Sequence, residues 1–321
     1  MNCHAISMAQ LERGPIPGPC ALVRMADTKE QLSSAAPGTE VSASLDLVFN
    51  DSGEDFGLVR APNETDAGRI LAFVEAHRDS VPHIVFQCQV GIGRSLAACA
   101  AVQKIFGVGD YKAALHRGTH NRRLYRLILA AAGQQPDPEP KISLAVRVKY
   151  APDRMHGFLL AIQRQRYDNW ELVFVTDGPN PAAREIVAAC GDARVKLVET
   201  EAPRGRWGHP YRQRGIEACT GELIGLSNDD NYYVPGYFEQ MVNALEREKA
   251  DLAMCAMLHS YWGWRPLEAG HDVGSWIARR ELLARTPWEG DDFFYDARFL
   301  DQLKRNAART AVVNRPLFIH N

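Results

Sequence analysis

The segment 133–140 is the feature that most constrains how this chain folds. It reads GQQPDPEP, with prolines at 136, 138 and 140 and no apolar side chain to bury. Prolines at this density stiffen the backbone and interrupt both helices and sheets. The 321 residues of the chain are a length that suits two domains. We therefore expect an N-terminal domain over 1–135, a proline-rich linker over 136–140 and a C-terminal domain over 141–321.

The bulk composition excludes several classes of partner. A formal net charge of -2 gives no electrostatic case for binding a nucleic acid. No apolar run reaches the roughly 20 residues that a transmembrane helix needs, and the N-terminal residues lack the pattern of a secretory signal. The cysteines are scattered without a CxxC pair, which favours a reducing compartment. We expect a cytoplasmic protein with no transmembrane segment and no nucleic-acid partner.

The first half of the chain is typical of a small α/β unit. LDLVF (45–49) and HIVFQ (83–87) have the apolar, β-branched character of strands. The stretch between them has apolar residues at helical spacing, and a second helix is expected from about Ser95 to Phe106. A glycine-rich turn joins the second strand to this helix. Such a turn holds phosphate, because its N–H groups and the helix N-terminus point at the anion.

The second half alternates apolar strand-like runs with amphipathic helical runs. Strands are expected at ISLAVRV, ELVFVTD, RVKLVET and ELIGLSNDD, with helical stretches between them. This alternation predicts a mostly parallel sheet with helices on both faces, as in a Rossmann-like fold. Ligands of such sheets bind at the carboxyl ends of the strands. Asp177 and the pair Asp229–Asp230 stand at two of these ends.

The glycine-rich turn contains a cysteine and an arginine at a spacing that suits phosphate chemistry. In HIVFQCQVGIGRSLAA, five residues separate Cys88 from Arg94, and Ser95 follows. A loop of this length wraps one phosphate, so that backbone N–H groups and the arginine hold its oxygens while the Cys88 sulfur faces the phosphorus. The alternative is a small buried cysteine at a strand end beside an arginine that opens a solvated helix.

Residues from about 20 to 133 resemble the dual-specificity branch of the protein tyrosine phosphatases. The resemblance rests on LDLVFND, FQCQVGIGRSLAACAA and RGTHNRRLYRLILAAAG. It implies a cysteinyl-phosphate intermediate on Cys88, with Arg94 as a catalytic partner, Asp51 as the general acid, Asp55 as the alternative acid, and no cofactor. Gln87 stands where the family usually has histidine, a departure that puts turnover in doubt. The implied phosphate-binding residues are Gln89, Val90, Gly91, Ile92, Gly93 and Ser95.

A second group of polar residues follows a strand of the C-terminal half. In LIGLSNDDNYYVPGYFEQM, an apolar run ends at Ser227 and is followed by Asp229, Asp230 and Asn231. Acidic residues at a strand end can hold a divalent cation that neutralises a diphosphate. The same residues also favour an ordinary tight turn, since they bond their own backbone.

Residues from about 141 to 321 resemble family-2, GT-A-type glycosyltransferases. The resemblance rests on ISLAVRV through VFVTDGPN, on NDDNYYVPGYFEQMV, on DVGSWIARRELL as the acceptor-side segment, and on DARFLDQL and PLFIHN. It implies a nucleotide-sugar donor bound by Asp177 and Asp229, and Asp296 as the base, with Asp291 and Asp292 as alternatives. Arg212, in a basic stretch, is expected near the donor. The implied ligands of a divalent cation, Mn²⁺ or Mg²⁺, are Asp229, Asp230, Asn231 and His320.

The two resemblances together predict a bifunctional enzyme. It would transfer a sugar from a nucleotide-sugar donor to a glycan, lipid or small-molecule acceptor, and hydrolyse a phosphomonoester. Two alternatives stay open. One is a glycosyltransferase whose phosphatase-like domain only binds a phosphorylated acceptor. The other is a signalling phosphatase with a non-catalytic glycan- or nucleotide-binding domain.

Overall fold

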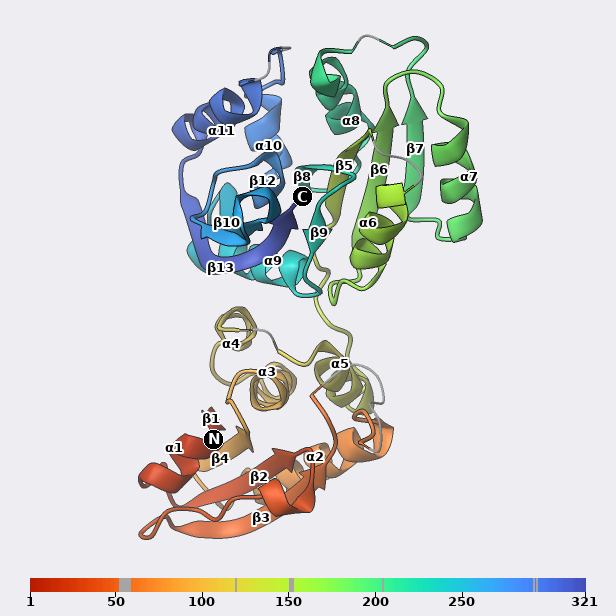
Figure 1. The fold of residues 1–321 in the computed structure, drawn as a ribbon. Helices are drawn as coiled ribbons and strands as arrows, with labels where there is room; N and C mark the ends of the chain where they lie inside the picture. Colours follow the sequence, from red (N-terminus) through yellow and green to blue (C-terminus); the bar gives the residue numbers. More distant parts are fainter. Residues whose placement is uncertain (52–58, 119, 150–152, 204, 291, 293) are drawn as a thin grey trace. The chain divides into compact units, whose positions relative to one another are not determined.

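The chain divides into two compact units, Met1–Pro138 and Glu139–Asn321, in the computed structural model (Figure 1). The division falls inside the proline-rich segment 136–140. The structure describes residues 1–51, 59–118, 120–149, 153–203, 205–290, 292 and 294–321. Within them, no helix is both long and apolar enough to cross a lipid bilayer.

The N-terminal unit is built on a parallel four-stranded sheet of order β1-β4-β2-β3. Side chains of β4 alternate between the faces. Ile84, Phe86 and Cys88 join the core under the helices α2, α3 and α5, and Val85 joins a smaller core that contains Leu11 of α1. The elements are β1 (Asn2–Ser7), α1 (Met8–Arg13), β2 (Cys20–Ala26), η1 (Lys29–Gln31), β3 (Val41–Val48), α2 (Glu64–His77), β4 (His83–Cys88), α3 (Arg94–Phe106), α4 (Tyr111–His116) and α5 (Arg122–Ala131).

The C-terminal unit is built on a larger, mixed sheet of order β7-β6-β5-β8-β12-β10-β13-β9, with β11 paired to β10. Its first half contains β5 (Ile142–Val148), α6 (Asp153–Gln163), β6 (Trp170–Thr176), α7 (Pro181–Cys190), β7 (Val195–Glu199), η2 (Arg206–Tyr211), α8 (Arg212–Ala218), β8 (Leu223–Asn228) and β9 (Tyr232–Tyr233). Its second half contains α9 (Tyr237–Glu248), β10 (Leu252–His259), η3 (Ser260–Trp262), β11 (Arg265–Leu267), η4 (Val273–Ser275), β12 (Trp276–Arg279), α10 (Arg280–Ala284), α11 (Tyr295–Asn306) and β13 (Thr310–His320).

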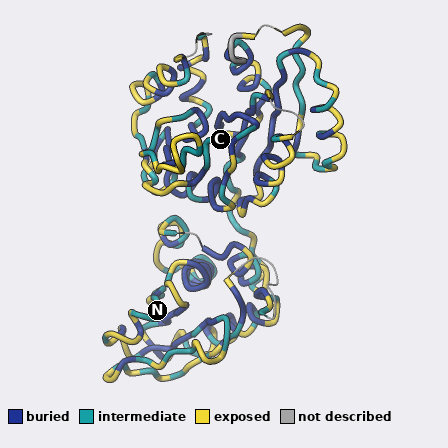
Figure 2. Tube along the Cα trace, viewed as in Figure 1, coloured by how far each residue is buried: buried dark blue, intermediate teal, exposed yellow. Residues whose placement is uncertain are grey.

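The two faces of this sheet carry separate cores. On one face, Ile142, Leu144 and Val146 of β5 pack with side chains of α6, α7 and α9. On the other face, Ala145 of β5 joins a core with α8, α10 and α11. Buried residues follow the strands and the inner sides of the helices, and exposed residues follow the outer turns (Figure 2). The predicted α/β class is therefore observed in this unit. The predicted mostly parallel sheet holds for β7, β6, β5 and β8, whereas β12, β9 and β11 run antiparallel to their neighbours, so the whole sheet is mixed.

Candidate active sites

The carboxyl ends of six strands meet at one edge of the larger sheet. β5, β6, β7 and β8 are mutually parallel. β12 is antiparallel to both β8 and β10, so β10 and its parallel neighbour β13 run in the same direction as β8. This shared edge therefore receives Asp177 after β6, Asp229 after β8, His259 at the end of β10 and His320 at the end of β13. It is the edge at which ligands of such sheets bind.

Asp229 ties the ends of β5 and β8 together. Its carboxylate accepts a hydrogen bond from the Lys149 N–H at 3.0 Å, and its own N–H donates to the Arg147 carbonyl at 3.1 Å. The side chain is fully buried. Oδ2 of Asp230 lies 3.4 Å from Nη1 of Arg154. The two neighbouring carboxylates therefore have different partners.

The predicted metal ligands are only partly brought together. Nδ1 of His320 lies 3.4 Å from Oδ2 of Asp272, a residue outside the predicted set of ligands. Among the described residues, no three His, Cys, Asp or Glu side chains form a group suited to a metal ion, so Asp229, Asp230 and His320 do not form one. Asn231 lies close to Asp272, because both side chains approach Gly274. A Cβ built on Gly274 would lie 2.9 Å from Nδ2 of Asn231 and 3.2 Å from Oδ1 of Asp272.

Asp272 is a largely buried carboxylate outside the site residues predicted from the sequence. It caps η4, and its Oδ1 accepts a hydrogen bond from the Gly274 N–H at 2.7 Å. Burial raises the pKa of this carboxyl, and the nearby His320 opposes the rise. In the sequence HDVGSW, an aspartate before a short turn is a common helix-capping residue. The sequence therefore indicates a structural role for Asp272 and gives no signal of a role in the site.

Arg212 is a buried cation at the start of α8. It donates to the Ser227 carbonyl at 2.6 Å and to Oδ1 of Asn228 at 2.7 Å. Burial lowers the pKa of this guanidinium to about 10, and Asp296 and Asp272 are among the charges that act on it. A basic stretch such as 204–214 can equally be a solvated helix, but that interpretation does not hold for Arg212, because its side chain is buried.

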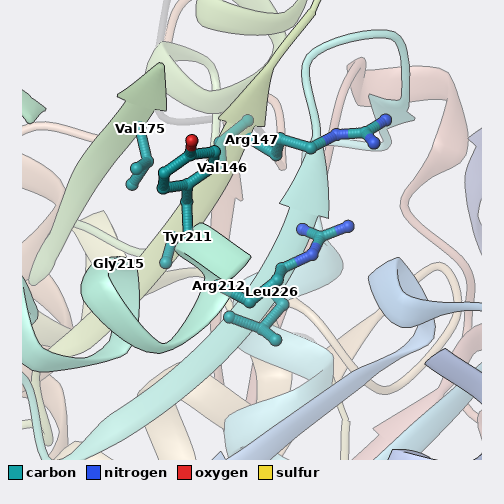
Figure 3. Close-up of a pocket in the computed structure, with 8 residues that line it drawn as sticks. Val146, Arg147, Val175, Tyr211, Arg212, Gly215 and Leu226 are labelled. Atoms are coloured by element: carbon teal, nitrogen blue, oxygen red, sulfur yellow. The ribbon is translucent and has the colours of Figure 1, made fainter. Parts of the chain in front are cut away.

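Arg147, Arg212 and Tyr211 line a small pocket between β5, β6 and α8 (Figure 3). The guanidinium groups of the two arginines extend away from the Tyr211 ring in the same general direction. The cavity measures about 10 Å³, which is room for about one water molecule. It is too small for a nucleotide, whose pockets span hundreds of Å³. A donor would therefore lie outside it, over the arginine ends.

Asp296 lies in the first turn of α11 and faces η2. Its Oδ1 is 3.2 Å from Nδ1 of His209, whose ring stacks on Trp288 with the ring centroids 5.4 Å apart. The alternative base Asp292 is an exposed residue whose carboxylate is paired with Arg298. Asp291 lies outside the described residues. Of the two described candidates, Asp296 is therefore the one that contacts a buried side chain of this edge, His209.

Asp177 is positioned by the loop that follows β7. Its Oδ2 accepts a hydrogen bond from the Gly205 N–H at 2.9 Å. Gly178, the next residue, has φ +87°, and a Cβ there would lie 2.9 Å from the Pro203 ring. Pro203 and Gly205 therefore lie against the end of β6, where Asp177 stands.

In the N-terminal unit, Cys88 ends β4 and the loop 89–93 leads into α3. Its Sγ accepts a hydrogen bond from the Gly91 N–H at 3.3 Å and lies 3.2 Å from Oγ of Ser95. Gly91 has φ +83°, and a Cβ there would lie 2.7 Å from the backbone N of Ser7. The predicted phosphate-binding residues Gln89, Val90, Gly91, Ile92, Gly93 and Ser95 thus form one turn and the start of a helix around the sulfur.

Arg94 and Asp51 both adjoin this loop. Nη1 of Arg94 donates to Oδ1 of Asp27 at 2.7 Å and to the Phe49 carbonyl at 2.6 Å, and its buried Nε has no hydrogen-bond partner among the described residues. The Asp51 carboxylate accepts a hydrogen bond from Nδ2 of Asn121 at 3.2 Å. Its Oδ2 lies 1.9 Å from the position of a Cβ built on Gly93. Asp55, the alternative acid, lies outside the described residues.

The C-terminal unit matches a known protein family. The model of glycosyl transferase family 2 matches residues 144–314, which is more than half of the chain. The match leaves the N-terminal unit outside it, so the phosphatase-like interpretation of Cys88 and Arg94 stays a prediction.

Two curated proteins are similar to parts of the chain. One is the putative glycosyltransferase EpsH of Bacillus subtilis (strain 168), 32% identical over 118 residues, which are 36% of this chain and 33% of EpsH. The other is the UDP-Glc:alpha-D-GlcNAc-diphosphoundecaprenol beta-1,3-glucosyltransferase WfgD of Escherichia coli, 19% identical over 141 residues, which are 44% of this chain and 52% of WfgD. The chain thus spans a third to about half of the length of these relatives.

Solved structures share the fold of the C-terminal unit. S. aureus TarS 1–349 superposes with a TM-score of 0.51 at 17% identity, over 56% of this chain and 60% of that one. TarS 1–349 in complex with UDP-GlcNAc gives a TM-score of 0.50 at 17% identity, over 56% and 58% of the two chains. This likeness shows a GT-A-like glycosyltransferase fold.

Proposed function

The chain belongs to glycosyl transferase family 2, and from this premise we propose that its C-terminal unit transfers a sugar from a nucleotide-sugar donor to an acceptor hydroxyl. The observation that carries the proposal is the charge arrangement around Arg212. The guanidinium carbon of this buried cation lies 5.7 Å from the centre of the Trp288 ring, and Trp288 stacks on His209, whose Nδ1 is 3.2 Å from Oδ1 of Asp296. Asp296 is among the charges that act on Arg212. Sugar transfer expels a diphosphate and removes a proton from the acceptor. A fixed cation stabilises the departing diphosphate, and a neighbouring carboxylate can take the proton.

Asp296 is the proposed base. Its carboxylate takes the proton of the acceptor hydroxyl, and the acceptor oxygen forms a bond to the anomeric carbon of the donor. The bond from that carbon to the diphosphate oxygen breaks, and its electron pair leaves with the diphosphate. Arg212 and Arg147 favour the departing anion, because their guanidinium groups extend in the same general direction from the end of β5 and the start of α8 (Figure 3).

Asp229, Asp230 and Asn231 are the residues that we propose for a divalent cation, with His320 as a further ligand. Oδ1 of Asp230 and Oδ1 of Asn231 are buried, and neither accepts a hydrogen bond from the described residues. Oxygen donors of this kind suit Mg²⁺ or Mn²⁺, so the chemistry of these two residues fits the cation. Among the described residues, His320 pairs with Asp272 and is not grouped with the carboxylates of Asp229 and Asp230. The cation, when bound, would neutralise charge on the diphosphate. Asp177 is proposed to bind the nucleotide from the end of β6.

The proposal is tested by donor turnover. UDP-sugars are the first donors to try, because the printed name of WfgD contains UDP-Glc and a TarS structure contains UDP-GlcNAc. GDP- and dTDP-sugars complete the panel, each with Mn²⁺, with Mg²⁺ and with a chelator. We expect metal-dependent release of the nucleotide by the wild type, and its loss in Asp229→Ala. The control is Asp79→Ala, an exposed carboxylate of the other unit. No metal-dependent turnover of any donor would overturn the proposal.

A second candidate function is phosphomonoester hydrolysis by the loop 88–95. It is supported by the two hydrogen-bonding contacts to Cys88 Sγ, from the Gly91 N–H and from Ser95 Oγ. In the first step the thiolate attacks phosphorus, an S–P bond forms, and the ester P–O bond breaks as Asp51 protonates the leaving oxygen. In the second step water attacks phosphorus, and the thiolate leaves with help from Ser95.

This second candidate is tested with p-nitrophenyl phosphate. We expect turnover by the wild type and none by Cys88→Ser. The control is Cys3→Ser, because Cys3 lies near the start of β1, and it is the other end of that strand that pairs with Cys88. Tungstate binding is measured in parallel. Tungstate binding without turnover in the wild type would select the alternative in which this unit only binds a phosphorylated acceptor. Turnover without any donor hydrolysis would select a phosphatase with a non-catalytic C-terminal unit.

A further inference from the structure

The exposed aromatic side chains of the described residues share one kind of location. All of them belong to the C-terminal unit and are close in sequence to candidate site residues or to His259, in β9, in η3 and the two residues after it, and at the start of α11. One follows Asn231, one precedes Asp296 by two residues, and three follow His259. The other large apolar side chains that are exposed are aliphatic. The exposed aromatic residues are Tyr232, Tyr261, Trp262, Trp264 and Phe294. A concentration of exposed aromatic surface marks a binding site more often than chance.

The segment 260–264, here named the aromatic segment, contributes most of this surface. Tyr261, Trp262 and Trp264 are 65%, 61% and 60% exposed. The Trp262 ring stacks on His259, with centroids 4.0 Å apart and planes at 4°. Stacking holds the orientation of the indole and covers one of its faces. The exposed fraction shows that the other face is open to a ligand.

The backbone of the aromatic segment is held in a costly conformation. Gly263 has φ +70° and Trp264 has φ +60°. For a bulky residue the left-handed region costs about 1–2 kcal/mol. Trp264 gains little burial in return. Burial of the side chain therefore does not offset the cost of this backbone conformation at Trp264.

The aromatic segment adjoins the proposed transferase site. It leaves β10 directly after His259, and His259 is in register with His320 of β13. The His259 and His320 rings are 4.8 Å apart between centroids, and Ser260 Oγ lies 3.0 Å from Oδ1 of Asn321. A ligand on Trp262 would therefore lie beside the edge at which Asp272 contacts His320.

We propose that the aromatic segment is the acceptor subsite and that the acceptor is a saccharide, whose pyranose ring stacks on Trp262. This inference rests on the proposed transferase function. A pyranose ring presents polarised C–H groups on one face, and these are attracted to the negative face of an indole. Its hydroxyl groups lie at the edge of the ring. On the side of the proposed base, His320 connects the aromatic segment to Asp272, and Asp296 is one of the charges that act on Asp272.

Charge distinguishes a saccharide from a membrane surface. Aromatic residues that anchor a protein to a membrane act with clustered lysine and arginine residues that attract anionic lipids. Residues 259–268 contain one basic residue, Arg265, and one acidic residue, Glu268, besides His259. The chain itself has a net charge of -2. An uncharged, hydroxylated ligand fits this balance better than an anionic bilayer does.

Binding is measured without donor, by saturation-transfer NMR. The probes are methyl pyranosides of glucose, galactose and N-acetylglucosamine and their β-linked disaccharides. The proteins are the wild type, Trp262→Ala, Trp264→Ala and Trp262→Phe. Leu160→Ala is the control, because Leu160 is an exposed apolar residue of α6 away from the aromatic segment. We expect Trp262→Ala to weaken saccharide binding about tenfold. Trp262→Phe should keep part of the affinity, and Leu160→Ala all of it.

The outcomes separate this inference from the function on which it rests. Trp262→Ala should keep the metal-dependent hydrolysis of the donor to water while it loses transfer to a saccharide. The inference is overturned if the wild type binds no saccharide up to the solubility limit, or if the tryptophan variants bind as well as the wild type. Tryptophan-dependent binding to phosphatidylglycerol vesicles without saccharide binding also overturns it. Tryptophan-dependent saccharide binding without donor hydrolysis would support the subsite and overturn the transferase instead.

Discussion

Nδ1 of His209 lies 3.2 Å from Oδ1 of Asp296, and the two atoms come from different elements, η2 and α11. Both atoms are buried, and neither has a hydrogen-bond partner among the described residues. The His209 ring is held by its stack on Trp288, with the planes at 11°. The proximity therefore places one oxygen of the Asp296 carboxylate against the His209 ring.

Replacing Asp296 with asparagine keeps the shape of the side chain and removes the base. We expect sugar transfer by Asp296→Asn to fall by about 10²–10⁴-fold, the range for the loss of a general base, while donor binding is kept. Asp301→Asn, an exposed carboxylate on the same helix, is the matched control. Single-turnover transfer assays and donor titrations separate the two effects. Unchanged transfer by Asp296→Asn, with loss in Asp292→Asn, would move the base to Asp292.

The burial of His209 makes a prediction about stability and pH. Burial lowers the pKa of His209, and Asp296 opposes this shift. Below about pH 6.5 the unfolded chain binds a proton that the folded chain resists, so stability falls as the pH falls, by at most about 1.4 kcal/mol per pH unit for one proton. The stability advantage of the wild type over His209→Gln should therefore shrink on going from pH 7.5 to pH 5.5, two values chosen to bracket that pKa.

Tryptophan fluorescence during urea unfolding measures this effect in the right unit, because every tryptophan lies after residue 139. The charged groups around His209 are Asp296, Asp292, Arg212 and Arg147, and both proteins contain them. His271→Gln, at an exposed histidine, should show the same difference from wild type at both pH values. An advantage of the wild type that grows on acidification would contradict the buried, neutral state of His209.

Arg212 links the fold to the proposed donor site. Arg212→Ala removes two hydrogen bonds to the end of β8 and leaves their acceptors buried. We expect it to lower the free energy of unfolding by about 2–4 kcal/mol. Arg212→Lys should lose less, since it keeps the charge but not the two-pronged donor. Arg214 is exposed and lies two residues after Arg212, so Arg214→Ala should change the free energy of unfolding by less than about 0.5 kcal/mol. Equal stability of the two alanine variants would contradict the burial of Arg212.

The parts of the fold that the sequence predicted are those with local signals. Strands β5, β6 and β8 are buried on both faces and appear as unbroken apolar runs, and the intervening helices show their own period. β13 was not predicted. It contains Pro316, and its pairing with β10 shifts register near Ala256. Proline inside a run argues against a strand in the middle of a sheet, so local reasoning fails there.

The site residues also divide into those with a local sequence signal and those brought together by long-range packing. The loop around Cys88 is contiguous in the chain, so its spacing alone placed Arg94 and Ser95 near the sulfur. The contact of His320 with Asp272 depends on the register of β10 with β13 and on the position of η4, which no local pattern encodes. The contact of His209 with Asp296 likewise depends on how η2 and α11 pack. Long-range pairings of this kind are what the sequence left unpredicted.

The last prediction concerns Gly93, the residue on which the proposed acid and the phosphate loop meet. A Cβ on Gly93 would lie 1.9 Å from Oδ2 of Asp51, so the carboxylate must move in Gly93→Ala. We expect this variant to hydrolyse p-nitrophenyl phosphate at least about tenfold more slowly, because an acid that is out of reach cannot protonate the leaving oxygen. Tungstate affinity should change less, since the loop N–H groups do not depend on Asp51.

Gly68→Ala is the matched control, because a Cβ there has open space within α2. It should keep full activity and raise stability by up to about 1 kcal/mol, as alanine favours a helix over glycine. The decisive comparison is between the single variants Gly93→Ala and Asp51→Asn and the double variant that combines them. If Gly93→Ala acts by displacing Asp51, then the double variant with Asp51→Asn should be no slower than Asp51→Asn alone. Additive losses would show that Gly93→Ala damages the loop itself, and full activity in Gly93→Ala would remove Asp51 from its proposed place beside the loop.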